Sequence, residues 1–137
     1  MSSTHADEPL HPNVAAYWRL IEAFNRNDLE TVGAVLDPDI VYTIPGQSAV
    51  AARTRGITAH LEALRRTRER SGNTLKLEPK TVVAGGDRVF VFGRISAERN
   101  GVHFESDHYV VFRFANGRIV EGITLPVDQY AFDAFWA

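Results

Sequence analysis

The chain has 137 residues, a formal net charge of −2 and no cysteine, which excludes disulfides, thiolate nucleophiles and sulfur-ligated metal sites. An apolar fraction of 45% with 23% charged residues is typical of one globular domain. The scattered basic residues do not form the surface that nucleic acids select, and no apolar run is long enough to span a bilayer. We therefore expect a cytoplasmic protein without nucleic-acid or membrane partners, in which a flexible N-terminal arm (1–12) precedes a single domain (13–137).

Two helices are predicted in the first third of the chain. Asn13 is placed to cap a helix whose apolar residues recur at helical spacing as far as Phe24. Asn27, with Glu30 three residues later, resembles a capping box for a second helix, which Pro38 ends.

A third helix is predicted over residues 58–70, with His60, Leu61 and Leu64 on its buried side. The rest of its surface is expected to be solvated and basic. It carries Arg65, Arg66, Arg68 and Arg70.

The remaining pattern is that of β-strands. A short strand is predicted over residues 40–44, and the turn Pro45-Gly46 and a polar loop follow it as far as Gly56. After Thr74, β-branched and aromatic runs alternate with turn dipeptides such as Asn100-Gly101. They predict a meander of four antiparallel strands at residues 75–84, 88–98, 102–115 and 118–126.

The two middle strands of this meander are apolar on both faces of the pleat. One face covers the core, so the other needs a different cover. A second copy of the chain would supply it, and we expect a homodimer through the outer sheet face that carries Phe90, Phe92 and Val111. The aromatic tail, residues 127–137, is expected to dock on the body of the domain or on a partner.

Helices followed by a curved antiparallel sheet give an α+β fold, with three N-terminal helices packed on the concave face. Several segments in this order resemble the SnoaL-like branch of the nuclear transport factor 2-like superfamily, whose fold is cone-shaped. The segments are Asn25-Arg26-Asn27-Asp28-Leu29-Glu30, Asp39 to Gly46, Gly117-Arg118-Ile119-Val120-Glu121 and Asp128-Gln129-Tyr130. Relatives in that superfamily include ketosteroid isomerase, polyketide cyclases, limonene epoxide hydrolase and scytalone dehydratase, so the resemblance implies a fold and leaves the reaction open.

The resemblance also disfavours two reactions. Ketosteroid isomerase needs a carboxylate base, a tyrosine and a protonated carboxyl, and the matching positions here hold Ile44, Leu20 and Val110. Limonene epoxide hydrolase needs an aspartate-arginine-aspartate relay. The nearest match is Arg94-Ile95-Ser96, with Asp128 near the second aspartate, so an epoxide hydrolase is only a second alternative.

The resemblance implies that four polar residues face the cavity, where we expect them to act in catalysis. They are Tyr17 and Tyr42 as hydrogen-bond donors, and His60 and His108 as buried, neutral bases. A one-residue shift in strand register would turn Asp107 inward instead of His108. The expected ligand-binding residues are Leu20, Phe24, Ile44, Leu64, Val110 and Thr124.

Two classes of function follow from this set. The first is an isomerase, cyclase or dehydratase that works without a cofactor on an apolar molecule with a carbonyl or hydroxyl group. The alternative is a protein of the same fold that binds a small ligand without turning it over, in which the four residues are ordinary core side chains. The histidine spacing does not match a metal motif, so neither a metal nor another cofactor is expected.

Overall fold

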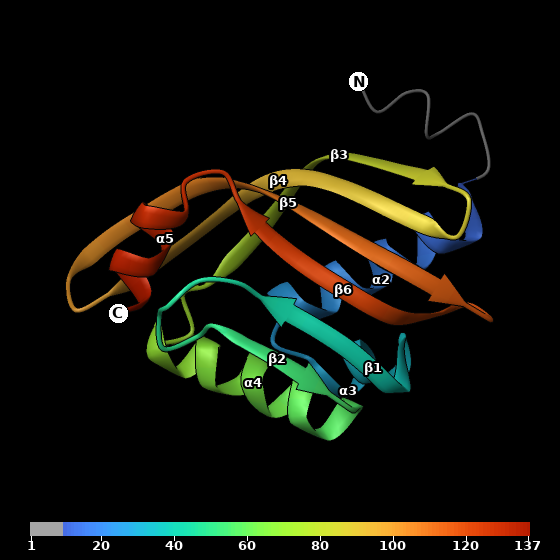
Figure 1. The fold of residues 1–137 in the computed structure, drawn as a ribbon, viewed down its shortest axis with the longest axis horizontal. Helices are drawn as coiled ribbons and strands as arrows, with labels where there is room; N and C mark the ends of the chain where they lie inside the picture. Colours follow the sequence, from blue (N-terminus) through green and yellow to red (C-terminus); the bar gives the residue numbers. More distant parts are fainter. Residues whose placement is uncertain (1–9) are drawn as a thin grey trace.

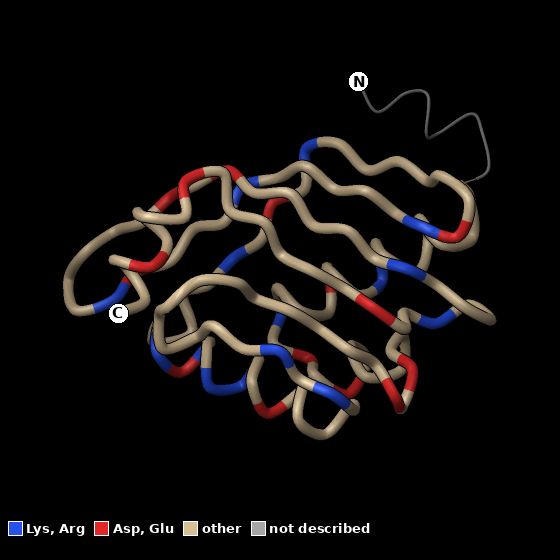
Figure 2. The backbone as a smooth tube through the Cα atoms, viewed as in Figure 1, with Lys and Arg blue, Asp and Glu red and all other residues tan. Residues whose placement is uncertain are grey.

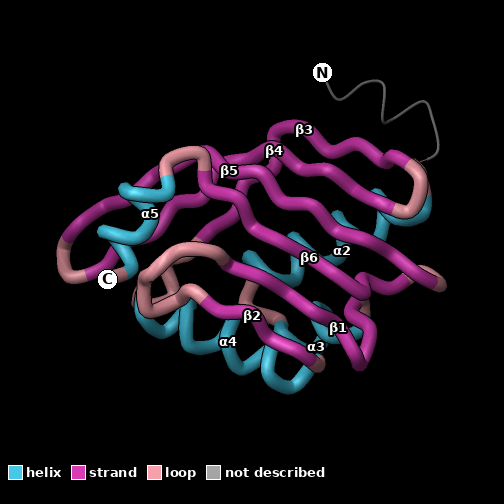
Figure 3. The backbone as a smooth tube through the Cα atoms, in the orientation of Figure 1, coloured by secondary structure: helices cyan, strands magenta, loops and turns pink. Residues whose placement is uncertain are grey.

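The computed structural model describes residues 10–137 and shows one open, curved sheet with helices against it (Figure 1). The helices are α2 (Pro12–Asn25), α3 (Leu29–Ala34), α4 (Ile57–Arg70) and α5 (Gln129–Trp136). The strands are β1 (Leu36–Ile44), β2 (Ala52–Arg55), β3 (Lys76–Gly85), β4 (Arg88–Arg99), β5 (Val102–Ala115) and β6 (Arg118–Pro126). Helices α2, α3 and α4 lie on one side of the sheet, as Figure 3 shows. The predicted α+β class with three N-terminal helices on a curved sheet is confirmed.

The sheet has the strand order β2-β1-β6-β5-β4-β3. Strands β3 to β6 form the predicted antiparallel meander, with ends within one residue of those expected. The prediction of an entirely antiparallel sheet is corrected at one place, because β1 runs parallel to β6. This pairing joins strands from opposite ends of the sequence.

The first two helices begin at residues other than those predicted. The side chain of His11, and not Asn13, caps α2 by accepting a hydrogen bond from the backbone N–H of Asn13 at 3.1 Å. Asn27 adopts a left-handed conformation in the turn after α2, with φ of 61°. The next residue, Asp28, therefore becomes the cap of α3 and accepts from the backbone N–H of Thr31 at 3.1 Å.

Other boundaries also differ from the prediction. Helix α3 ends at Ala34, and Pro38 lies inside β1, where the extended backbone suits the fixed φ of proline. The expected loop after Pro45 contains the edge strand β2, whose four residues are too few to show an alternating pattern. The predicted arm (1–12) falls mostly on residues 1–9, outside the described residues, and Pro12 already belongs to α2. No helix within residues 10–137 is long and apolar enough to cross a membrane.

The aromatic tail docks on the body of the same chain. It forms α5, which Asp128 caps, and it buries Phe132, Phe135 and Trp136. The backbone N–H of Ala49 donates to the Trp136 carbonyl at 3.3 Å, which ties the end of α5 to the loop between β1 and β2. The tail therefore closes one part of the core.

Arg68 departs from the predicted basic surface of α4. It is 4% exposed, whereas Arg65, Arg66 and Arg70 are exposed. Its Nη1 donates to the carbonyls of Phe24 at 3.0 Å and of Leu75 at 3.3 Å. Arg68 therefore satisfies backbone groups at the end of α2 and just before β3, and it ties both segments to α4.

We predict that Arg68→Met lowers the free energy of unfolding by about 2 kcal/mol, because two carbonyls lose a buried donor. The matched control is Arg66→Met on the same helix, where only an exposed ion pair with Glu62 at 3.0 Å is lost. We expect its effect to stay below about 1 kcal/mol. Urea unfolding of the two variants measures the difference, and equal losses would contradict the structural role of Arg68.

Candidate functional site

A cavity of about 110 Å³ lies between the helices and the concave face of the sheet. This volume is several times the ~10–15 Å³ that one water molecule needs. All ten predicted site residues line it, which brings together side chains from α2, β1, α4, β5 and β6. Sequence reasoning missed other residues that line it, among them Val50, Thr67, Phe112, Phe132 and Trp136. The aromatic density of the tail indicated that Phe132 and Trp136 dock on the domain, but it did not indicate where they dock.

Two histidines are buried in the walls of this cavity. His60 lies on α4 and His108 on β5, and each is 5% exposed. The inward position of His108 shows that the predicted strand register holds, with Asp107 on the opposite face of the sheet. No hydrogen bond of either imidazole occurs within residues 10–137, and Nδ1 of His108 is buried without a partner.

Burial keeps both imidazoles neutral. It lowers the pKa of His60 to about 4 and the pKa of His108 to about 4, because an apolar wall cannot solvate an imidazolium. The nearby Asp107 carboxylate opposes the shift of His108 only in part. At neutral pH both side chains therefore have a free nitrogen lone pair that can accept a proton or a hydrogen bond.

A hydroxyl pair lies on the sheet between these histidines. Tyr42 Oη and Thr124 Oγ1 are 2.7 Å apart, and either hydroxyl can donate. Burial raises the pKa of Tyr42 to about 12, so the phenol stays protonated. If Thr124 donates to Tyr42, the phenol proton is free for a ligand oxygen.

Gly122 makes room for this pair. Gly122 on β6 is the direct neighbour of Tyr42 on β1, and a Cβ at this position would lie 2.5 Å from Tyr42 Cε2. The absence of a side chain at Gly122 leaves room for the Tyr42 ring, whose hydroxyl reaches Thr124. Tyr42 is also stacked on His60, with ring centroids 4.7 Å apart.

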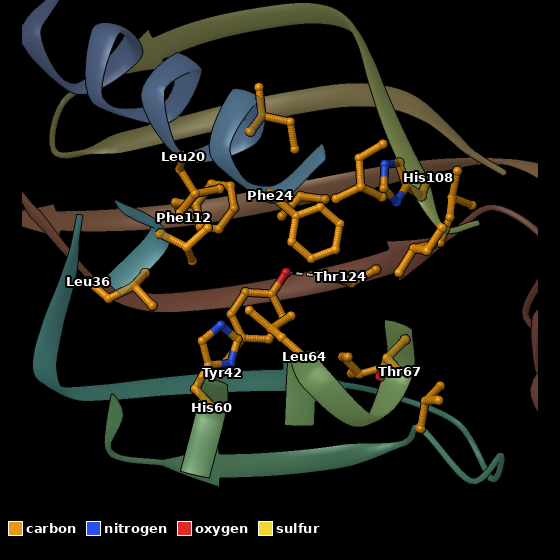
Figure 4. A pocket seen from close by; sticks show the side chains of 18 of the residues that line it. Leu20, Phe24, Leu36, Tyr42, His60, Leu64, Thr67, His108, Phe112 and Thr124 are labelled. Carbon is orange, nitrogen blue, oxygen red and sulfur yellow. Dashed lines mark hydrogen bonds between the residues drawn. The ribbon is translucent and has the colours of Figure 1, made fainter. Parts of the chain in front are cut away.

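The polar groups follow one another along the cavity. His60 stacks on Tyr42, Tyr42 bonds Thr124, and Thr124 is paired across the sheet with Val110, two residues from His108 on the same face. Figure 4 shows the two imidazoles on opposite sides, with the Tyr42 hydroxyl and the Phe24 ring between them. A ligand in this space would meet an imidazole at each side and the hydroxyl pair in the middle.

Tyr17 completes the set from α2. It is 3% exposed, and its ring packs against Phe112 with centroids 5.6 Å apart. Burial raises the pKa of its phenol above the ordinary value, so this hydroxyl also stays protonated.

The cavity has no charged lining. None of its lining residues is Asp, Glu, Lys or Arg, and within residues 10–137 no three metal-ligating side chains gather at one point. Arg94 of the expected epoxide hydrolase pattern lies on the other face of the sheet, where it pairs with Asp107 and Glu105. Asp128 caps α5. Because neither residue lines the cavity, the structure does not support an epoxide-opening relay there.

Comparison with known proteins agrees with this architecture. The model of the SnoaL-like domain matches residues 17–122. The chain belongs to the SnoaL-like family. No curated protein matches the sequence.

Solved structures of the same fold cover nearly the whole SnoaL-like chain. Bal32a, from a soil-derived mobile gene cassette, is 31% identical with a TM-score of 0.89 over 92% of this chain and 97% of its own. IdmH of Streptomyces antibioticus, described as a candidate polyketide cyclase, is 27% identical with a TM-score of 0.71 over 85% and 93%. TerC, crystallised with polyporic acid, is 22% identical with a TM-score of 0.83 over 91% and 98%, a likeness that shows the fold alone.

We predict that stability falls as the pH is lowered from about 6.5, because the unfolded chain then binds protons that buried His60 and His108 cannot take until about pH 4. Each neutral histidine contributes to the free energy of unfolding fully above pH 6.5, and this contribution is lost below pH 4. Between these values, each histidine lowers the free energy of unfolding by up to about 1.4 kcal/mol per pH unit. Urea unfolding at pH 7, 6 and 5 measures it.

Two variants separate this effect from other titrations. The double variant His60→Leu/His108→Leu should show a smaller loss of stability between pH 7 and pH 5. His103→Gln should increase this loss, because the pKa of exposed His103 is raised by Glu105 and its proton uptake stabilises the folded state as the pH falls. A wild-type stability that does not change from pH 7 to pH 5 would refute the burial argument.

We also predict that Gly122→Ala destabilises the protein by about 1–3 kcal/mol, because the new methyl group overlaps the Tyr42 ring. The control is Gly33→Ala in α3, where the added Cβ lies 3.4 Å from the flexible Leu61 Cδ1 and relieves the cost of helical glycine. Thermal unfolding should show a lower midpoint for the first variant only.

Proposed function

We propose that this protein binds a small, mainly apolar molecule with a carbonyl or hydroxyl group and moves protons on it without a cofactor, as an isomerase, cyclase or dehydratase. The observation that carries the proposal is two neutral imidazoles flanking a hydroxyl pair in a cavity without charged side chains. Nδ1 of His108 is buried without a hydrogen-bond partner, which costs stability in a purely structural core, whereas Tyr42 and Thr124 are partners of each other.

The proposed roles follow from the chemistry of each group. The phenol of Tyr42, supported by Thr124, donates to the ligand oxygen. An imidazole, either His108 or His60, takes a proton from the adjacent carbon, and the electrons of the broken C–H bond form an enol or enolate. The empty cavity disfavours an imidazolium. The negative charge that develops on the ligand oxygen stabilises the imidazolium by electrostatic attraction.

The fate of that proton distinguishes the reaction types. In an isomerisation the imidazolium returns it to another carbon. In a dehydration it goes to a departing hydroxyl group, which leaves as water. In a cyclisation the enolate carbon attacks a second carbonyl, and the proton goes to the new alkoxide. The resemblance to IdmH favours the cyclase form, and the TerC structure with polyporic acid supports a small-ligand pocket in this fold.

The second candidate is a binding protein that holds a similar ligand without turning it over. Two observations favour the binding protein. The lining residues include no carboxylate that could act as a base. An imidazole with a pKa of about 4 is itself a weak base in the empty cavity. Both candidates need the same cavity, so binding and proton transfer have to be measured separately.

The proton-transfer proposal is tested with neutral probes that have an acidic C–H, such as apolar 1,3-diketones and aromatic ketones. A thermal-shift screen first selects the probes that bind. Proton NMR in D₂O then measures exchange of the C–H adjacent to the carbonyl. We expect exchange above the buffer rate in the wild type and a loss of about 100-fold in His108→Ala, in His60→Ala, or in both.

His103→Ala is the matched control, because this histidine is exposed and lies outside the cavity. It should leave exchange unchanged. Binding without exchange in any form of the protein would refute the enzyme and support the binding protein, whereas equal exchange in all variants would place the chemistry elsewhere.

We propose a second copy of the chain as the partner of the outer sheet face. This face exposes large apolar side chains, among them Phe90 at 42% and Tyr109 at 51%. A two-fold contact between two copies would bury these side chains and remove apolar surface from water. Large exposed apolar patches commonly mark such interfaces.

A further inference from the structure

Two residues that line the cavity each have a buried polar atom without a partner among residues 10–137. These atoms are Nδ1 of His108 and Nε1 of Trp136. The side chain of Trp136 is completely buried. An indole N–H can only donate, and a buried donor without a hydrogen bond costs stability because its hydration is lost on folding. Such groups in native proteins usually have a partner, so the N–H of Trp136 calls for an acceptor from outside the chain.

Trp136 lies at the His108 side of the cavity. Phe135, the residue before it, stacks on Phe104 of β5 with ring centroids 4.6 Å apart. Phe104 and His108 share the inward face of β5. Figure 1 shows α5 beside the hairpin between β4 and β5, whereas the first turn of α4, which carries His60, lies at the end of that helix away from α5. The unpartnered indole is therefore placed toward the end of the cavity opposite His60.

Trp136 is held in place before any ligand binds. Its ring packs against Phe132 and Phe135, with centroids 6.4 and 4.9 Å away. Its backbone carbonyl accepts from the N–H of Ala49 at 3.3 Å, and the carbonyl of Phe135 accepts from Arg99 Nη1 at 2.9 Å. Because the indole is already ordered, a hydrogen bond from it to a ligand costs little additional conformational freedom.

The surroundings of Trp136 favour a neutral acceptor. No charged residue lines the cavity. The loop between β1 and β2, to which the end of α5 is tied, also has no charged residue at positions 45–51 (Figure 2). A ligand carboxylate would lose its hydration there without gaining a counter-charge. A carbonyl oxygen can accept from the indole N–H at a much smaller cost of desolvation.

We propose that the indole N–H of Trp136 donates a hydrogen bond to a neutral oxygen of the bound ligand, at the end of the cavity opposite His60. This inference rests on the proposed small-ligand function and narrows its ligand class. Tyr42 with Thr124 provides a donor for one ligand oxygen, and Trp136 provides a donor for a second. The preferred ligand is therefore a neutral molecule with an acceptor oxygen at each end of an apolar body. Fixing both ends orients the ligand relative to the imidazoles, as proton transfer requires.

A matched pair of probes tests this inference. 1,4-Diacetylbenzene has an acetyl oxygen at each end, and 4-ethylacetophenone has nearly the same shape with one oxygen fewer. Proton–nitrogen NMR titrations at millimolar probe concentration measure both dissociation constants. We expect the wild type to bind 1,4-diacetylbenzene about tenfold more tightly, because only this probe can satisfy both donors. The indole N–H signal of Trp136 should move downfield as it binds.

Two variants identify the donor. Trp136→Phe keeps an aromatic ring and removes the N–H. Trp18→Phe is the matched control, because Trp18 is the other tryptophan of the chain and does not line the cavity. The tenfold difference between the probes should disappear in Trp136→Phe and persist in Trp18→Phe. Circular dichroism checks that each variant is folded, and Trp18→Phe alone is enough to assign the two indole signals of the wild type.

The outcomes separate this inference from the proposed function. If neither probe binds the wild type at millimolar concentration, the proposed pocket for small carbonyl compounds is overturned, and this inference with it. Three other results would overturn the role of Trp136 only. They are equal binding of the two probes by the wild type, an indole signal of Trp136 that does not move, and a difference between the probes that persists in folded Trp136→Phe.

Discussion

The parallel pairing of β1 with β6 is the constraint on which the rest of the structure depends. It joins the helical first half of the chain to the meander of the second half, at Val41 opposite Glu121 and Tyr42 opposite Gly122. Because Gly122 has no side chain, there is room for the phenol ring of Tyr42, whose hydroxyl reaches Thr124. One backbone pairing therefore places the first strand, positions a polar pair in the cavity and provides the surface against which α4 presents His60.

Desolvation gives that cavity its chemical character. The surrounding side chains are almost all apolar, so imidazoles in the wall are held neutral and phenols are held protonated. A charged side chain is unfavourable in this cavity unless a ligand supplies an opposite charge. A reaction that develops negative charge on a ligand oxygen while an imidazole gains a proton would create two opposite charges together. The same environment suits a neutral ligand that never ionises, which is why binding and turnover are separate questions for this fold.

The sheet uses its two faces for different purposes. Inward residues such as Val110 and Phe112 line the cavity, while their neighbours Val111 and Arg113 face outward. Strand alternation thus places a cavity wall and a charge-patterned surface on the same segment. A change of register by one residue would exchange Asp107 with His108 and damage both faces at once, so the two uses reinforce a single register.

The sequence by itself determined the features that depend on local periodicity. The meander was predicted to within a residue at its strand ends, because turn dipeptides such as Asn100-Gly101 and a period of two specify strands locally. Alternation also put His108 on the same face of the strand as Val110, and the family resemblance turned that face inward. Tertiary structure decided what depends on distant segments: the parallel partner of β1, the edge strand β2 and the burial of Arg68 against the carbonyls of Phe24 in α2 and of Leu75 just before β3. It also decided the contact of Tyr42 with Thr124, because residues 82 positions apart meet only after the chain has folded.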